Sequence, residues 1–442
     1  MKKQSIKIIY YTLAAIMLLS GISCKKDYTN PSAVPIDDAF SSPQAMTGVV
    51  IGIQRVYTVG RGSSFYNRIA LDGLLTNQLI VLNQGNTSEY QLQLGGGSVD
   101  GTNTILGGLW TTSNKVIFDA DNVLTNAANL GDKGYASGLI GYAAIFKALA
   151  IGDLAMFWEQ IPEGIGQNVG FTDREAGFSK AIETIDNALA AIAANPISSQ
   201  FLTALPQNPA PPAVNPAIEI VNTLNALKAR FSLFIGNYAQ ALAAANEVNL
   251  SVKSTFNFSS VNLNPIFETV TSTNNVYAPT DSTMGLPPAL APDLADKRVP
   301  FYISTNASNP RFRVSGFAAA STTPWPIYLP GEIILIKAEA YARQAAPDLA
   351  NALIELNKVV TKQPSADPFG VGAGLAPETA TTQAEILDLI YKHRSIELFM
   401  SGLRLEDMRR FGRANAERKR NFLPYPFLER DNNPNTPPDP AF

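Results

Sequence analysis

Apolar residues recur at intervals of three and four along most of the chain, which is the spacing of one face of an α-helix. Between residues 36 and 59, Met46, Val50 and Ile53 lie on such a face, after a start signal at Ser42. Alternation typical of β-strands is sparse, so the pattern predicts a mainly α protein with minor β. Further helices are expected at residues 109–130, 137–157, 177–194, 216–234, 237–248, 331–345, 349–361 and 382–400.

Three long stretches carry no helical periodicity. Residues 83–103 are rich in Gly, Asn and Gln, residues 196–216 are rich in Pro, and residues 249–328 are rich in Ser, Thr, Asn and Pro. Irregular segments of this length in a compact protein usually carry function or cover a site. We therefore expect a loop-rich face, with a loop-rich insert at about residues 249–329.

Two pairs of expected helices have the layout of tetratricopeptide units. In residues 224–248 the run that starts at Gly236 resembles the turn and second helix of such a unit, and the pair 333–343 and 349–360 repeats the layout. This sequence pattern predicts a tetratricopeptide-like scaffold of helical hairpins. Such a scaffold either forms a concave peptide groove or holds other elements in place, and we favour the second interpretation.

The first residues have the pattern of a targeting segment. Lys2, Lys3 and Lys7 precede an apolar run at residues 8–19, which is too short to cross a hydrocarbon core of about 30 Å as a stable helix. We therefore interpret residues 1–23 as a signal peptide.

Cys24 is the only cysteine of the chain, and it directly follows small residues at the end of this segment. The arrangement resembles the lipobox of bacterial lipoproteins, which implies that Cys24 is lipidated and that acyl chains hold the mature protein on a membrane. Residues 24–35 are then a lipidated tether, and residues 36–442 are expected to form a single domain. A plain secretory signal followed by an incidental cysteine is the alternative.

The amino-acid composition excludes several kinds of partner and functional site. Charged residues make up 16% and hydrophobic residues 46% of the 442 positions, so long charged tails are not expected. The net charge is −3 and no polybasic run is present, which disfavours nucleic acid as a partner. One His and one Cys exclude disulfide scaffolds, zinc sites built from Cys and His, and most chemistry that depends on imidazole.

No catalytic pair, metal site or cofactor site is predicted. Asp and Glu residues are frequent, but no spacing singles out the acid and the nucleophile or base of a glycosidase. No calcium-loop motif occurs, and Asp431 with the two Asn residues after it is interpreted as a turn. The only imidazole, that of His393, lies within an expected helix and is interpreted as packed or solvated.

Residues 394–412 read RSIELFMSGLRLEDMRRFG. This segment resembles the signature of the SusD/RagB nutrient-binding outer-membrane lipoproteins, and residues 332–343, 224–238 and 422–434 resemble other segments of that family. Ser401 departs from the family pattern, which usually has Glu there. The resemblance implies a SusD-like α superhelix that is lipid-anchored in the outer membrane and faces outside. It further implies binding of an extracellular nutrient, most often an oligosaccharide, and its delivery to a SusC-like TonB-dependent β-barrel transporter.

Two other functions remain open. A tetratricopeptide-like scaffold lipoprotein could organise other envelope proteins, and a surface glycosidase is a weaker alternative. A scaffold should co-purify with several proteins, whereas a nutrient-delivering lid should co-purify with one large barrel. An enzyme should release reducing ends from glycans.

The charged residues of the signature are spaced for ion pairs. Arg394 and Glu397 lie three positions apart, as do Arg404 and Asp407, so each pair can meet on one helical face. Gly402 is expected to end one helix so that the next starts in a new direction. We interpret these residues as a structural lattice that fixes the last helices, rather than as a charged ligand site.

Aromatic residues in irregular segments are the candidates for ligand contacts. Flat rings stack on the CH faces of sugars, while Asn, Gln and Asp bind the hydroxyl groups. Trp110 and Trp158 are instead expected in the core. Local loop packing is the alternative role for each of the candidate ligand-binding residues, which are Tyr90, Tyr277, Trp325, Asn274 and Asn275.

Overall fold

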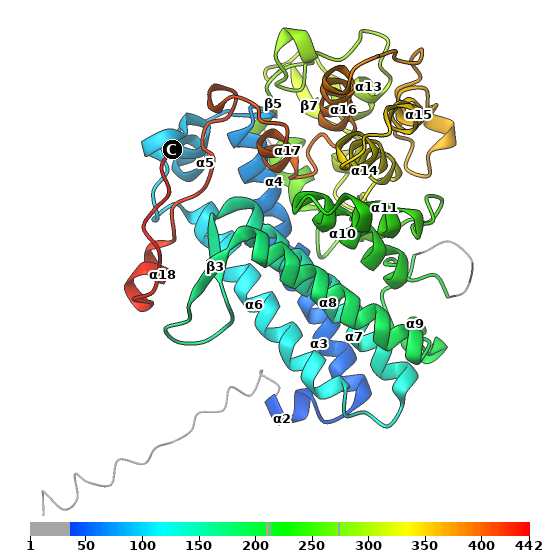
Figure 1. Cartoon of the computed structure of the whole chain (residues 1–442). Coiled ribbons are helices and arrows are strands. Elements are labelled where there is room, and N and C mark those ends of the chain that lie inside the picture. The colour runs from blue at the N-terminus through cyan, green and yellow to red at the C-terminus, as the bar shows by residue number, and fades with distance from the viewer. Residues whose placement is uncertain (1–35, 209–211, 213, 273–274) are drawn as a thin grey trace, which may run out of the picture.

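The computed structural model describes residues 36–442 except 209–211, 213 and 273–274 (Figure 1). The expected signal peptide, the tether with Cys24, and Asn274 lie outside the described residues. The described chain is mostly helical, with a few short strands, so the predicted fold class is confirmed.

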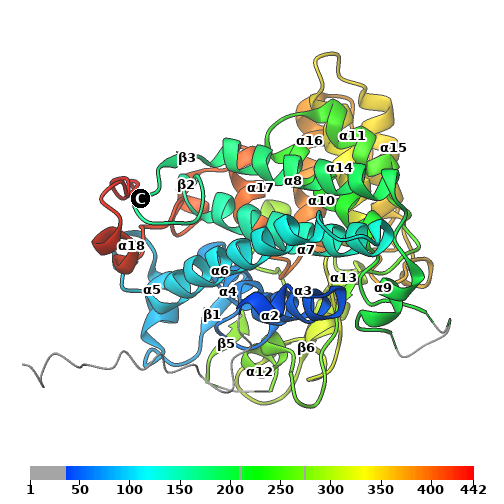
Figure 2. The ribbon, with the colours of Figure 1, turned by 90° about the horizontal axis from the view of Figure 1, so that it is seen from below.

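Long helices dominate the first half of the chain. They are α3 (Pro43–Thr58), α4 (Ser64–Leu75), α6 (Thr104–Ala127), α7 (Lys133–Phe157) and α8 (Arg174–Ala194). Figures 1 and 2 show α6, α7 and α8 side by side, and α7 packs against both of its neighbours and against α3. The sequence analysis did not predict α4, although Ser64, Asn67, Arg68 and Asp72 are spaced as one face of a helix; all twelve residues of α4 are buried.

Helix α7 is the central helix of this layer. Among the described residues it is long and apolar enough to cross a membrane, but 89% of its apolar window is buried inside the protein, as in a core helix. Neighbouring elements approach its backbone closely. A Cβ atom on Gly138 would lie 2.2 Å from Phe201, and one on Gly152 would lie 2.5 Å from Phe231.

In the second half of the chain, helical hairpins pack on one another, as the tetratricopeptide-like sequence pattern predicted. Helices α10 (Ile220–Phe234) and α11 (Tyr238–Asn246) form one hairpin, and α14 (Pro330–Arg343) and α15 (Leu349–Val360) form another. Gly236, at φ 71°, makes the first turn, and the Asn237 side chain caps α11 by accepting from the Gln240 N–H. Helix α11 packs on α14, while α10 also contacts α7 and α8 and so joins the two halves.

The chain after these hairpins closes the fold. Helix α16 (Gln383–Glu397) packs on α14 and α15, and α17 (Arg404–Arg410) lies against α4 of the first half. The remaining short helices are α2 (Ile36–Ala39), α5 (Thr87–Leu94), α9 (Ser199–Ala204), α12 (Pro265–Val270), α13 (Arg298–Tyr302), α18 (Phe427–Asn432) and the 3-10 turns η1 (Gly96–Ser98), η2 (Pro288–Leu290), η3 (Gly316–Ala318), η4 (Pro364–Ala366) and η5 (Asn415–Glu417).

The strands form short antiparallel ladders, most of which involve the long stretch 249–328 that was expected to be irregular. Within the described ranges they pair β1 (Leu79–Val81) with β5 (Tyr277–Pro279), β2 (Gln160–Pro162) with β3 (Phe171–Asp173), β4 (Thr255–Phe256) with β8 (Trp325–Pro326), and β6 (Ile303–Thr305) with β7 (Phe312–Val314). The β4–β8 ladder ties together the two ends of the loop-rich insert, which turns a long segment into a closed, packed unit.

Candidate functional site

Charged residues of the signature form a buried network with charged residues from other segments. We call this network the signature cluster: Arg394, Glu397, Asp407 and Arg410 of the signature, with Arg298, Glu339 and Lys362. Arg394 donates two hydrogen bonds to Asp407, each of 3.0 Å. Arg410 donates to the same carboxylate at 2.6 Å and to both oxygens of Glu339. Burial works to raise the pKa of Asp407, but the two guanidinium groups outweigh it and hold that pKa below the usual range.

Glu397 does not pair with Arg394, so that predicted pair is wrong. Its carboxylate accepts from Arg298 at 3.1 Å and from Lys362 at 2.8 Å. It also lies directly against α14, where a Cβ atom on Gly331 would come within 1.8 Å of its Oε1. Glu397 is the last residue of α16, and its side chain therefore reaches segments outside its own helix.

Arg404 does not pair with Asp407, so the second predicted pair is also wrong. Its guanidinium donates to the carbonyl oxygens of Met284, at 2.6 Å, and Ser395, at 2.7 Å. Side chains on a helix lean toward its N-terminus, and Arg404 is the first residue of α17, so it points away from Asp407. Gly402, at φ 76°, lies in the connection that redirects the chain between α16 and α17.

Both ring nitrogens of His393 have hydrogen-bond partners next to the signature cluster. Arg298 Nη2 lies 2.9 Å from His393 Nδ1, and His393 Nε2 lies 3.2 Å from Glu378. Because a guanidinium can only donate, Nδ1 must accept and Nε2 must carry the proton. Burial, together with the nearby charge of Arg298, lowers the pKa of His393, so the ring is neutral at pH 7.

No grouping of three or more His, Cys, Asp or Glu side chains suited to a metal occurs among the described residues. The signature cluster has bidentate or multiple partners for each carboxylate, and it leaves no open carboxylate for a ligand. A cavity elsewhere in the molecule, in contrast, is open to a ligand.

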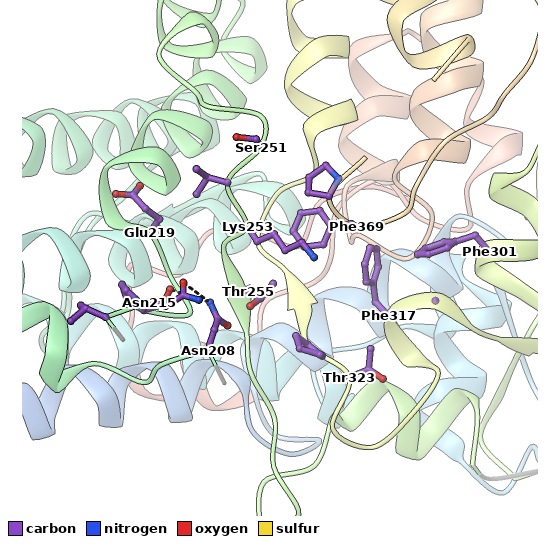
Figure 3. Close-up of a pocket in the computed structure, with 16 residues that line it drawn as sticks. Asn208, Asn215, Glu219, Ser251, Lys253, Thr255, Phe301, Phe317, Thr323 and Phe369 are labelled. Carbon is purple, nitrogen blue, oxygen red and sulfur yellow. Dashed lines mark hydrogen bonds between the residues drawn. The ribbon is translucent and has the colours of Figure 1, made fainter. Parts of the chain in front are cut away.

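A pocket of about 710 Å³ opens between the end of the Pro-rich segment, residues 251–255 and two loops of the second half (Figure 3). We call it the Phe pocket after Phe301, Phe317 and Phe369, which line it. Its volume falls within the range of about 300 to 1,000 Å³ that is typical of small-molecule sites.

The three phenylalanines form one wall of the Phe pocket. The Phe301 and Phe317 rings lie 5.3 Å apart and meet edge to face, as do the Phe317 and Phe369 rings at 5.9 Å. Phe301 and Phe369 are partly exposed, whereas only 8% of Phe317 is exposed. The wall is therefore anchored in the core through Phe317 and offers ring surface to a ligand.

Polar side chains lie on the other side of the Phe pocket (Figure 3). Asn208 donates to the carbonyl of Pro216 at 3.3 Å and to Asn215 Oδ1 at 3.4 Å, while its own Oδ1 accepts from Asn257 at 3.1 Å. Glu219 caps α10 by accepting from the Asn222 N–H at 2.6 Å, and burial raises the pKa of its carboxyl group. This wall presents amide and carboxylate groups held in fixed positions.

Tyr277 and Trp325, two of the candidate ligand-binding residues, are buried, with 1% and 4% of each residue exposed, so neither ring offers an open face on which a sugar could stack. Each sits in a two-stranded ladder whose side chains face the core. The Tyr277 hydroxyl accepts from Tyr66 at 3.2 Å, and the Trp325 ring lies 5.4 Å from Phe65. Trp325 also lies 5.9 Å from Phe317 and so supports the Phe pocket from behind.

Tyr90 and Asn275 lie in a second region. Tyr90 is partly exposed on α5, and Asn275 is held nearby because its Oδ1 accepts from Asn83 and its carbonyl accepts from Asn86, both at 2.7 Å. Neither residue lines the Phe pocket. A role for these two residues in ligand binding stays a prediction. Trp110 and Trp158 are core residues, as predicted.

Sequence reasoning missed the residues of the Phe pocket. Phe301, Phe317 and Phe369 lie outside the apolar helical stripes, which is the same signal that selected Tyr90, Tyr277 and Trp325. Restricting the search to Tyr and Trp excluded them.

The chain is similar to proteins of the SusD family in part of its sequence and in its fold. Residues 246–437 match the model of the SusD family. The fold is similar to that of a SusD-like protein from Bacteroides fragilis, with a TM-score of 0.70, 12% identity, and coverage of 93% of this chain and 100% of the other. A SusD superfamily protein from Bacteroides vulgatus gives 0.69 at 16% identity, covering 91% and 99%. A laminarin-binding SusD-like protein gives 0.63 at 15% identity, also covering 91% and 99%. No curated protein sequence matches this chain.

Proposed function

We propose that this chain, whose residues 246–437 match the SusD family model, acts as a SusD/RagB protein: it binds an extracellular nutrient, most often an oligosaccharide, and delivers it to a SusC-like TonB-dependent β-barrel in the outer membrane. The Phe pocket is the single observation that carries the binding part of this proposal. It is large enough for one or two sugar rings, and it opens to solvent between loops rather than within the helical scaffold.

The two walls of the Phe pocket suit the two surfaces of a sugar. The exposed parts of Phe301 and Phe369 can stack on the CH face of a ring, and Asn208, Asn215 and Glu219 can bind hydroxyl groups at its edge. Among the described residues that line the Phe pocket, Glu219 is not accompanied by a second carboxyl group, whereas a glycosidase needs two. This lining supports binding as the function.

Calorimetry with a panel of oligosaccharides tests the binding proposal. Wild type should bind at least one member, and Phe369→Ala should weaken that binding by about tenfold, as expected for a stacking contact. Phe427→Ala is the matched control, because Phe427 is 56% exposed on α18 and does not line the Phe pocket. Failure of wild type to bind any member, or equal binding by Phe369→Ala, would overturn the glycan assignment at this site.

We further propose a lipid anchor at Cys24, supported by the position of the only cysteine directly after the signal segment. Cys24→Ala should move the mature protein from the membrane fraction to the soluble fraction, because several acyl chains are needed for stable attachment. Metabolic labelling with a fatty acid should mark wild type and not the variant. An unlabelled wild type would contradict the anchor.

The transporter partner is tested by mild detergent extraction and affinity capture of the anchored protein. One large β-barrel protein should co-purify in about equal amount. Recovery of several envelope proteins and no barrel would instead favour the scaffold function.

A further inference from the structure

The Phe pocket holds a positive charge that faces its aromatic wall. Of the described residues that line it, Lys253 and Glu219 carry charge. The Lys253 ammonium lies 5.4 Å from the centre of the Phe369 ring, and Figure 3 shows it pointing toward the phenylalanine side of the pocket.

Lys253 has no carboxylate partner within 4.0 Å among the described residues. Lysines on the nearby helices differ in this respect, since Lys228 pairs with Asp186 at 2.6 Å and Lys358 pairs with Glu355 at 2.7 Å. An ammonium group that is held over a ring and lacks an anionic partner is available to a ligand.

Glu219 does not neutralise this charge. One oxygen of its carboxylate, Oε2, accepts from the Asn222 N–H at the N-terminus of α10, where the carboxylate interacts with the positive end of the helix dipole. In Figure 3 it stands on the opposite wall from the phenylalanines. An anionic group placed against Phe369 therefore meets Lys253 and lies away from Glu219.

We infer that the Phe pocket selects acidic sugars, with a ring stacked on the phenylalanine wall and a carboxylate or sulfate substituent bound by Lys253. This inference rests on the proposed function and names its substrate class. The ring contact supplies affinity for sugars in general, while the ammonium group supplies the preference for a negative charge.

Matched oligosaccharide pairs test the inference. One pair is an oligogalacturonate and the same oligosaccharide with its carboxyl groups reduced; the other is a sulfated oligosaccharide and its desulfated form. Wild type should bind the acidic member of at least one pair about tenfold more tightly in 50 mM salt, and the preference should shrink in 500 mM salt because salt screens the charge pair. The pair that shows the preference identifies the anionic group.

Three variants assign the preference to its residue. Lys253→Met keeps the aliphatic stem and should abolish the preference, by lowering the affinity for the acidic member about tenfold to that of the neutral member. Lys253→Arg should retain the preference. Lys115→Met removes an equal charge from an exposed position on α6 and should change nothing.

Two results would overturn the inference in distinguishable ways. If both members of each pair bind equally to wild type and that binding still depends on Phe369, the selection for acidic sugars is wrong and the proposed function stands. If neither member of either pair binds, and no other oligosaccharide binds, the proposed glycan function fails and this inference fails with it.

Discussion

The signature cluster and the Phe pocket differ in how their charged side chains are paired and buried. In the signature cluster Arg394 and Asp407 are buried and joined by two hydrogen bonds of 3.0 Å. In the Phe pocket Lys253 is exposed, and its ammonium lies 5.4 Å from the centre of the Phe369 ring without a carboxylate partner among the described residues. The segment with the most distinctive sequence is therefore scaffold, and the candidate site is built from residues that no motif marks.

The free-energy cost of burying a charge explains this difference. Taking an ion out of water costs several kcal/mol, so a buried charge persists only with well-placed partners, and a set of such partners restricts the residue types at many positions. A binding pocket needs only a shaped cavity and a few polar groups, which different residues can supply.

The largest effect is expected from breaking the signature cluster at Asp407. Asp407→Ala leaves Arg394 and Arg410 facing each other without their shared carboxylate, and it should lower the free energy of unfolding by about 3 to 5 kcal/mol. Urea unfolding at pH 7 measures it. The double variant Arg394→Met with Asp407→Leu should recover much of the loss, and a loss below about 1 kcal/mol in the single variant would contradict the buried-pair assignment.

Trp325→Ala tests whether this tryptophan is a core residue. It should cost about 3 to 5 kcal/mol of stability, because a large ring packed against Phe65 and Phe317 leaves a cavity. Thermal and urea unfolding should both show the loss. A variant with unchanged stability and no ligand binding would restore Trp325 as a direct ligand contact.

The pH dependence of stability tests a buried carboxylate of the scaffold, Asp153. It accepts from Tyr57 at 2.7 Å, and burial raises the pKa of Asp153 to about 6 despite the nearby Arg68. A raised carboxyl pKa stabilises the fold below the unfolded pKa of about 3.9, and that contribution is lost as the pH rises through about 6. Relative to Asp153→Asn, wild type should therefore lose about 2 to 3 kcal/mol between pH 4 and pH 7.5.

Urea unfolding of wild type and Asp153→Asn at several pH values gives this comparison. Curves of stability against pH that run parallel for the two proteins would mean that Asp153 keeps an ordinary pKa.

The smallest effect on stability is expected at the Phe pocket. Phe369→Ala should cost less than about 1.5 kcal/mol of stability, because the ring is partly exposed and its removal opens no closed cavity. Differential scanning calorimetry compares it with Trp325→Ala, which differs in burial and lies on the far side of Phe317. Equal losses in the two variants would show that the pocket wall is part of the core.

The helical hairpins could be predicted because their signals are local. Gly236 and the apolar period around it predict the α10–α11 turn, and the structure has that turn at φ 71°. Helix α4 was not predicted although its polar residues recur at helical spacing; in the fold that polar face is buried as well, where Arg68 pairs with Asp153 and Asp72 accepts from the Leu405 N–H.

The candidate site depends on contacts between distant parts of the chain. Asp407 meets Arg394 rather than Arg404 because the turn at Gly402 brings two helices together, and spacing along one helix contains no information about that turn. Tyr277 and Trp325 lie in loop-like sequence, but pairing with β1 and β4 directs both rings inward. Phe301 and Phe369 come together with Phe317 only in the folded chain.

The state of His393 makes it a spectroscopic probe. The chain has one histidine, and its ring is held between Arg298 and Glu378 at the edge of the signature cluster. A proton NMR spectrum should therefore contain a single set of imidazole resonances from a protein of 442 residues. Its chemical shift reports on the packing of the last helices without any label, so a change that ligand binding causes in this packing can be followed from inside the scaffold.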